Sequence, residues 1–142
     1  MIAGELYPVI KAVYDADTGA GGLAEVGGAA YVRSFFRMGD PDDRSQNWPI
    51  IRVEFIENEA DSFGNDSVRA VVRFHLFTNS YNKFDTQGAV LARLRTLYHR
   101  VDLAASTNWS YNWLSFRNGS QAQTTENELH YVVPAQLVAR KV

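Results

Sequence analysis

The sequence predicts a single α+β domain over residues 1–142, with a mainly antiparallel sheet of four to five strands, an N-terminal helix and one long central helix packed on the sheet. Three observations favour this fold class. Apolar residues recur at helical spacing in two segments, they alternate with polar residues in several others, and neither a repeat nor a linker divides the chain. With 142 residues, 46% of them apolar and 21% charged, the chain can bury one core.

The first helix is predicted over Glu5 to Tyr14, because apolar residues lie three and four positions apart in this segment and share one face. These residues are Leu6, Val9, Ile10, Val13 and Tyr14. Pro8 lies near the start of the helix, where its missing N–H costs least. The glycine-rich segment that follows, residues 15–28, is typical of an ordered surface loop or a flexible arm.

Alternation of apolar and polar residues predicts the next strands. One strand is expected over Ala30 to Phe36, and Trp48-Pro49 leads into a second, because the residue before a proline favours extended backbone. A third strand, Val68 to Phe77, should pair with the second, in which Ile51, Val53 and Phe55 alternate with polar residues. The connector, residues 57–66, is too long for a tight turn and should project as a hairpin.

The long central helix is expected over Lys83 to Val101, where one stripe of apolar residues runs along the segment. The stripe consists of Val90, Leu91, Leu94, Leu97, Tyr98 and Val101. Asn82 can cap the first turn, and Asp85 suits the positive end of the helix dipole.

Two further strands complete the predicted sheet. Trp109 to Phe116 alternates aromatic residues, and Asn118-Gly119 after it indicates a turn. Glu128 to Arg140 alternates apolar residues on one face. Because Pro134 cannot donate to a strand ladder, this last strand is expected at an edge of the sheet or with a bulge at the proline.

Residues that could perform catalysis form no known motif, and we predict that the protein is not an enzyme. The absence of cysteine excludes disulfides, thiolate metal sites and cysteine nucleophiles. His75, His99 and His130 could meet in space and hold a metal with a carboxylate, but their spacing matches no metal motif, so neither a metal nor another cofactor is expected. Glu54 could be a half-buried acid or could pair with Arg52, Arg69 or Arg73 across the hairpin.

The charges are unevenly distributed, although the formal net charge is only -2. Half of the acidic residues lie between Asp40 and Asp66, whereas the third strand and the central helix are basic. Such asymmetry is found in a solvated acidic hairpin, but it also favours head-to-tail association of subunits or an acidic lining that repels phosphate. The charges predicted at a subunit interface are those of Arg69, Arg73, Arg93, Arg95, Asp40, Asp42 and Asp43.

Several features follow one another along nearly the whole chain: the amphipathic first helix, the Trp48–Val53 segment that opens a long strand, the acidic hairpin, the Asn79-Ser80-Tyr81 exit, the central helix and the final Tyr131–Pro134 strand. This order resembles that of the tail terminator, or tail-completion, proteins of long-tailed bacteriophages. The resemblance implies a homo-hexameric ring that caps the tail tube, stops its polymerisation and joins the tail to the head or neck. Its partners would be the tail tube protein and a neck or head-completion protein, and double-stranded DNA would pass through the ring.

A ring around DNA should not grip the phosphates, so acidic residues are expected near the pore or on an axial contact surface. They are Glu57, Glu59, Asp61 and Asp66. The expected location is the virion, at the tail or neck, after assembly in the bacterial cytoplasm and without membrane contact. Three alternatives remain: another neck component such as a head-closure or head–tail joining protein, a small ligand-binding α+β domain that uses Glu54 and a histidine, and a nucleic-acid-binding module.

Overall fold

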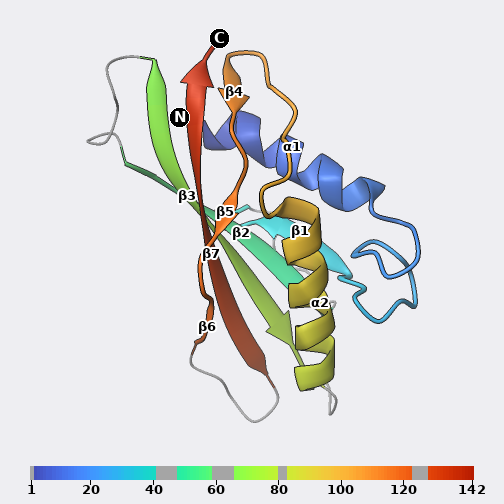
Figure 1. Ribbon diagram of the computed structural model, residues 1–142. Coiled ribbons are helices and arrows are strands. Elements are labelled where there is room, and N and C mark those ends of the chain that lie inside the picture. The colour runs from blue at the N-terminus through green and yellow to red at the C-terminus, as the bar shows by residue number, and fades with distance from the viewer. Residues whose placement is uncertain (1, 41–47, 59–65, 80–82, 123–127) are drawn as a thin grey trace.

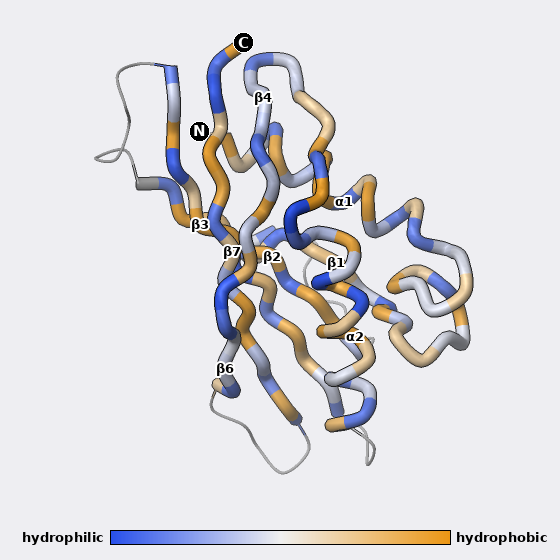
Figure 2. The backbone as a smooth tube through the Cα atoms, in the orientation of Figure 1, coloured by the Kyte–Doolittle hydropathy of each residue, from blue (hydrophilic) through white to orange (hydrophobic). Residues whose placement is uncertain are grey.

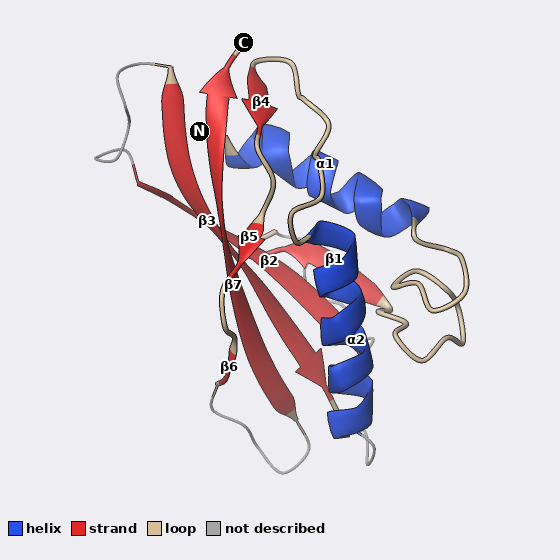
Figure 3. Cartoon of the chain, viewed as in Figure 1, coloured by secondary structure: helices blue, strands red, loops and turns tan. Residues whose placement is uncertain are grey.

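The computed structural model describes residues 2–40, 48–58, 66–79, 83–122 and 128–142. In these residues the helices and strands are α1 (Ala3–Ala16), β1 (Ser34–Arg37), β2 (Ile50–Asn58), β3 (Ser67–Thr78), α2 (Lys83–Tyr98), β4 (Trp109–Tyr111), β5 (Ser115–Phe116), β6 (Ser120–Gln121) and β7 (Leu129–Lys141). Figure 1 shows a strongly twisted sheet with α1 and α2 on the same side of it. The long strands and the two helices can be followed by colour in Figure 3.

The sheet is larger than predicted and has mixed strand directions. Seven strands are present, in the order β1-β2-β3-β7-β4, and β5 and β6 also pair with β7. All pairs are antiparallel except β1 with β2, which run parallel. The expectation of four to five mainly antiparallel strands is therefore only partly right. The long connection over residues 38–49 permits the parallel pair, because parallel neighbours need a crossover of about a dozen residues.

The hydrophobic core lies between the sheet and the helices. On β3 the residues Ala70, Val72, Phe74 and Leu76 are buried, whereas the residues between them are at least partly exposed. Every second residue of a strand points to the same face, so this pattern places the four apolar side chains against the helices. The alternation along β3 and β7 is visible as alternating colours in Figure 2. The prediction of an amphipathic hairpin from β2 and β3 is confirmed.

Both helices pack on this core, and their lengths differ little. The helix α1 has 14 residues and α2 has 16, so the expectation of one distinctly long helix is only partly right. The hydroxyl of Tyr98 donates to the carbonyl of Ile10 at 2.7 Å and joins the two helices. The helix α2 ends at Tyr98 instead of Val101, because Arg100 adopts a positive φ of 56° and its N–H donates a hydrogen bond to the carbonyl of Leu114 at 2.9 Å. Val101 is consequently 39% exposed.

Two predicted strands are shorter than expected, because loops take over their hydrogen bonds. The segment Ala30–Phe36 becomes a strand only from Ser34, since Val32 N–H donates to the Leu23 carbonyl and Arg33 N–H to the Pro49 carbonyl. The predicted strand Trp109–Phe116 is divided into β4 and β5 at Asn112, whose side-chain oxygen accepts the N–H of Val138 at 2.7 Å.

The expectation that Pro134 marks an edge strand is wrong, because β7 pairs with β3 on one side and with β4, β5 and β6 on the other. The carbonyl of Pro134 accepts the N–H of Arg117, which lies on the side of the short strands. In an antiparallel strand the N–H and C=O of one residue point the same way, so the proline nitrogen faces this side too. The outer pairing is interrupted there, between β5 and β6, and the ladder with β3 continues past the proline.

Candidate functional site

The sheet has a second face, which points away from both helices and which we call the outer face. Its side chains are the alternate residues of the three long strands, opposite in direction to the core residues. They include Arg52, Glu54, Arg69, Arg73, His75, Phe77, His130, Gln136, Val138 and Arg140, none of which is fully buried. The described part of these strands places four arginines and one glutamate at outer-face positions. A fifth arginine, Arg117, reaches the same face and donates to Gln136 at 2.9 Å.

A row of three polar side chains crosses the outer face diagonally from β2 to β7. The Nε2 atom of His75 lies 3.0 Å from Oε1 of Glu54, and its Nδ1 atom lies 2.9 Å from Nε2 of His130. The register explains the row, because His75 lies opposite Arg52 and Val132, so that Glu54 and His130 are its diagonal neighbours. Arg73 lies directly opposite Glu54 and pairs with its carboxylate at 3.5 Å.

The hydrogen bonds of this row require a donor or an acceptor at each ring nitrogen. An ionised carboxylate only accepts, so Nε2 of His75 donates to Glu54. When His75 is neutral, its Nδ1 atom accepts from His130. If both rings are charged, two N–H groups face each other and the bond between the rings is lost. Burial lowers the pKa of His130, and the charges of His75 and Arg52 lower it further.

Of the three histidines, only His75 and His130 are in contact. His99 lies apart from the other two, and its Nδ1 atom accepts the backbone N–H of Phe116 at 3.0 Å. Partial desolvation, followed by the charges of Arg95 and Arg100, lowers the pKa of His99. Within the residues that the structure describes, no group of three or more histidines and acids is placed to hold a metal ion.

An open apolar groove lies next to this row on the outer face. It has a volume of about 490 Å³ and includes Ile56, Arg69, Val71, Asn112, Gln136 and Val138 among its lining residues. Val71 lies opposite Ile56 on one side and Gln136 on the other, and Arg69 lies opposite Val138. Three aliphatic side chains are thus grouped beside one arginine. Glu54, His75 and His130 do not line the groove, so the row and the groove are separate features.

The residues predicted to form an acidic pore lining have different environments. Glu57 is half-buried at the end of β2, and its carboxylate accepts the N–H of Ala3 at 3.0 Å. A negative charge at the first turn of α1 complements the helix dipole, so Glu57 anchors this helix. Asp66 is exposed just before β3. Glu59 and Asp61 lie outside the described residues.

The residues predicted to form interface charges are also distributed over several surfaces. Arg69 and Arg73 are exposed on the outer face, and Arg95 is exposed on α2. Asp40 is partly exposed after β1, and its charge is one of the causes that raise the pKa of Tyr7, behind the desolvation of that side chain. Asp42 and Asp43 lie outside the described residues.

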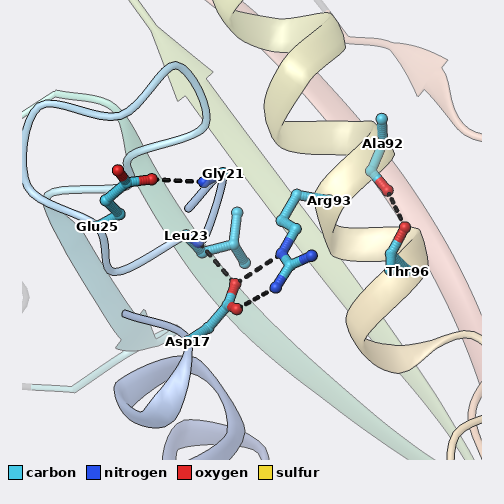
Figure 4. Close-up of polar contacts among 7 residues, drawn as sticks. All are labelled: Asp17, Gly21, Leu23, Glu25, Ala92, Arg93 and Thr96. Carbon is cyan, nitrogen blue, oxygen red and sulfur yellow. Dashed lines mark hydrogen bonds and ion pairs between the residues drawn. The ribbon is translucent and has the colours of Figure 1, made fainter. Parts of the chain in front are cut away.

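Arg93 is used within the chain, by an ion pair that the sequence pattern did not indicate. Its guanidinium donates to both carboxylate oxygens of Asp17, through Nε at 2.9 Å and through Nη2 (Figure 4). Asp17 also accepts the N–H of Leu23 at 2.7 Å, and its side chain is only 6% exposed. The bond to Arg93 lowers the pKa of Asp17 most strongly. Asp17 stands among glycines without any periodic pattern, so only the fold identifies its partner.

This ion pair holds the glycine-rich segment against α2, so the segment is an ordered loop and not a flexible arm. Leu23 is fully buried, and its carbonyl accepts the N–H of Val32 at 2.8 Å. The hydroxyl of Tyr14 donates to the carbonyl of Val32 at 2.5 Å, and burial raises the pKa of Tyr14 to about 12. The loop therefore belongs to the same folded unit as the sheet.

Comparisons with solved structures found the same fold over almost the whole chain. A chain of the structure "Virion of native gene transfer agent (GTA) particle" superposes with a TM-score of 0.66 at 18% identity, covering 99% of this chain and 98% of that one. Another solved protein matches with a TM-score of 0.53 at 12% identity, covering 96% of this chain and 95% of its own. At such identities the similarity establishes the fold. No family model matches the sequence, and a search of curated proteins found no match.

In the described ranges neither α1 nor α2 has the length and apolar character that crossing a bilayer requires.

Proposed function

We propose that this protein is a structural virion protein of the tail terminator type, which caps a phage-like tail tube as a homo-hexameric ring and has no catalytic role. The similarity of fold to a chain from a gene transfer agent virion supports the proposal most directly, because it extends over 99% of this chain. The order of the sequence features, which resembles that of the tail terminators, also favours it.

The distribution of charge suits a ring built from identical subunits. A ring needs two different surfaces on each subunit, because the contact is head-to-tail and its rotation must close. The outer face carries five arginines and one glutamate among the residues named above, whereas the whole chain has a formal charge of -2. Arg69 and Arg73 are exposed on the outer face and remain the proposed basic side of the contact, and Asp40, Asp42 and Asp43 remain the proposed acidic side. Arg95 is exposed on α2 and would belong to another surface of the ring.

Partners and location follow from this role. The ring would contact the tail tube protein on one side and a neck or head-completion protein on the other, within a virion assembled in the bacterial cytoplasm. Double-stranded DNA would pass through its channel. A head-closure or head–tail joining protein is the alternative, and binding to the portal vertex instead of tail-tube ends would identify it.

The first test is the mass of the purified protein by light scattering, together with negative-stain images of the same sample and of the sample mixed with tail tubes. We expect six-fold rings, free or at tube ends. A persistent monomer that binds neither tube ends nor the portal vertex would contradict the proposal.

The acidic residues near the pore require a second test. We propose that Glu57, Glu59, Asp61 and Asp66 lie near the channel or an axial contact surface, where they weaken the attachment of DNA phosphates. Glu57 must be left unchanged, because its carboxylate binds the first turn of α1. A triple Lys variant at Glu59, Asp61 and Asp66 should slow DNA passage or impair docking. Wild-type assembly and infectivity of this variant would contradict that assignment.

A further inference from the structure

The glycine-rich loop presents an exposed apolar side chain, which packs little against the rest of its own chain. Val26 is 82% exposed. It lies at the tip of a turn in which Gly28 N–H donates to the Glu25 carbonyl at 3.0 Å and Gly27 has a φ of +81°. A positive φ at the third position of such a turn strongly favours glycine, so the sequence Val26-Gly27 suits this turn and places Val26 at its tip.

The tip is held rigidly before any partner arrives. Glu25 Oε2 accepts the N–H of Gly21 at 2.5 Å, and the base of the loop is fixed by the pair of Asp17 with Arg93 (Figure 4). A preorganised apolar side chain loses little conformational freedom when it is buried by a partner, which favours binding. Residues 16–32 contain two acids and no basic residue, and Arg93 already neutralises Asp17. The tip is therefore apolar with a local negative charge from Glu25.

The groove on the outer face has the complementary properties. Ile56, Val71 and Val138 provide an apolar lining, and Arg69 provides a positive charge at its wall. The volume of about 490 Å³ leaves room for more than one side chain. Interfaces between proteins commonly combine a small apolar centre with arginine.

The tip and the groove lie on opposite sides of the molecule. In Figure 1 the loop between α1 and β1 projects on the right, whereas the ends of β2 and β3 that border the groove lie on the upper left. The tip therefore cannot enter the groove of its own chain. Two complementary surfaces on opposite sides of one subunit are the requirement for a repeating head-to-tail contact.

We infer that the Val26 turn of one subunit docks into the outer-face groove of the next copy of the chain. Val26 contacts the aliphatic lining, and Glu25 lies towards Arg69. This inference rests on the ring of the proposed function and assigns the two surfaces that build it. It also gives the glycine-rich loop a role, as the part of the fold that reaches the neighbouring subunit.

Disulfide trapping tests the contact directly, because the chain has no cysteine of its own. Two single variants, Val26→Cys and Ile56→Cys, are mixed under mild oxidation and examined on a non-reducing gel. We expect a covalent dimer in the mixture and none with either variant alone, since a disulfide requires Cβ atoms about 4 Å apart. Phe84→Cys, at a side chain that is 65% exposed on α2, is the matched control and should not link to Ile56→Cys.

A double variant that carries both cysteines separates this inference from the proposed function. A ladder of linked chains that stops at six supports both. A longer ladder without closure supports the docking contact and contradicts the hexameric ring. If the double variant forms six-fold rings in images but no disulfide on the gel, the proposed ring is supported and the docking contact is overturned.

Variants that change the charge at the contact give a second, independent readout. Val26→Asp places a charge in the apolar groove and should weaken self-association at least tenfold by light scattering. At concentrations where both proteins are monomeric its unfolding curve should be unchanged, because Val26 is exposed in one chain. Arg69→Glu should slow the formation of the disulfide, because it places a negative charge opposite Glu25, whereas Arg69→Lys keeps the positive charge and should slow it less. Equal association of Val26→Asp and the unaltered protein, or linkage through Phe84→Cys instead of Val26→Cys, would overturn the inference.

Discussion

The two faces of the sheet are formed by the same strands, but apolar burial holds the side chains of one face and hydrogen bonds and charges hold those of the other. The inner face of β3 is mainly apolar and is buried from Ala70 to Leu76 beneath the helices, so these side chains are fixed by burial. The outer face of β3 carries Arg69, Arg73 and His75, which are held by hydrogen bonds and charge and remain partly open. The inner face therefore provides stability, and the outer face remains available for contacts with other molecules.

Two phenylalanines on β3 test this division with the largest expected effect. Phe74 is fully buried, and its ring centroid lies 5.3 Å from that of Tyr98. Phe77 lies on the outer face, stacked on His130 at 4.2 Å. Phe74→Ala should lower the free energy of unfolding by about 3–5 kcal/mol, because it leaves a cavity in the core. Phe77→Ala should lower it by only about 1 kcal/mol, because a half-exposed ring removes less apolar area from water.

Urea unfolding followed by circular dichroism measures both variants on the same scale. Equal losses of stability would mean that the outer face is packed as tightly as the core.

The next effect concerns the pair of Asp17 and Arg93, the polar contact that fixes the loop to the inner, helix-covered side. Asp17→Asn should lower the free energy of unfolding by about 2–3 kcal/mol, since it removes the negative charge from a largely buried side chain that accepts two hydrogen bonds from Arg93. Asp15→Asn, which removes the exposed pair with Lys11, is the control and should change stability by less than about 1 kcal/mol.

The same variant has a predicted pH dependence. Arg93 holds the pKa of Asp17 below its ordinary value of 3.8, so the unfolded chain binds this proton more readily than the folded one. The stabilisation is complete above that ordinary value and is lost as the pH falls through the folded pKa. The difference between wild type and Asp17→Asn should therefore shrink in acid. A constant difference from pH 7 to pH 2 would show that the charge of Asp17 is not responsible.

The smallest effect concerns His130 on the outer face. Burial, and then the charges of His75 and Arg52, lower the pKa of His130 from its ordinary value of 6.5. The folded protein then binds this proton less readily than the unfolded chain, so stability falls as the pH drops through 6.5. His130→Gln should remove this part of the pH dependence. Thermal unfolding of both proteins between pH 5 and pH 8 measures it, and parallel curves would contradict the role of His130.

The patterns in the sequence predicted the elements better than their arrangement. Helix α1, the hairpin of β2 and β3, helix α2 and strand β7 all follow from apolar spacing, because burial of one face dictates that spacing. The boundaries after Tyr98 and around Asn112 were not predictable, since hydrogen bonds to distant residues determine them. The edge position expected from Pro134 was wrong for a related reason. A proline interrupts pairing only on the side to which its nitrogen points, and the sequence does not show which neighbour lies on that side.

The candidate site was predictable only as a list of residue types. The sequence identified Glu54, the histidines and the arginines of β3, but not that Glu54, His75 and His130 form one row. That row depends on the register of three strands that are far apart along the chain, and a shift of one residue would turn its members to the core. Alternation within a strand indicates which of its residues lie on the same side of the sheet, but it does not indicate which residues of neighbouring strands lie opposite each other.

The sequence by itself therefore determined the α+β class, the two apolar helix faces and the alternation that separates a core face from an open one, because these depend on local spacing. Only the tertiary structure decided that β7 lies inside the sheet, that Asp17 binds Arg93, and that an apolar tip and an apolar groove lie on opposite sides of the molecule. Each of these joins residues that are distant in the chain. The free energy that selects such contacts comes from burial and charge pairing across the whole fold, which no local pattern contains.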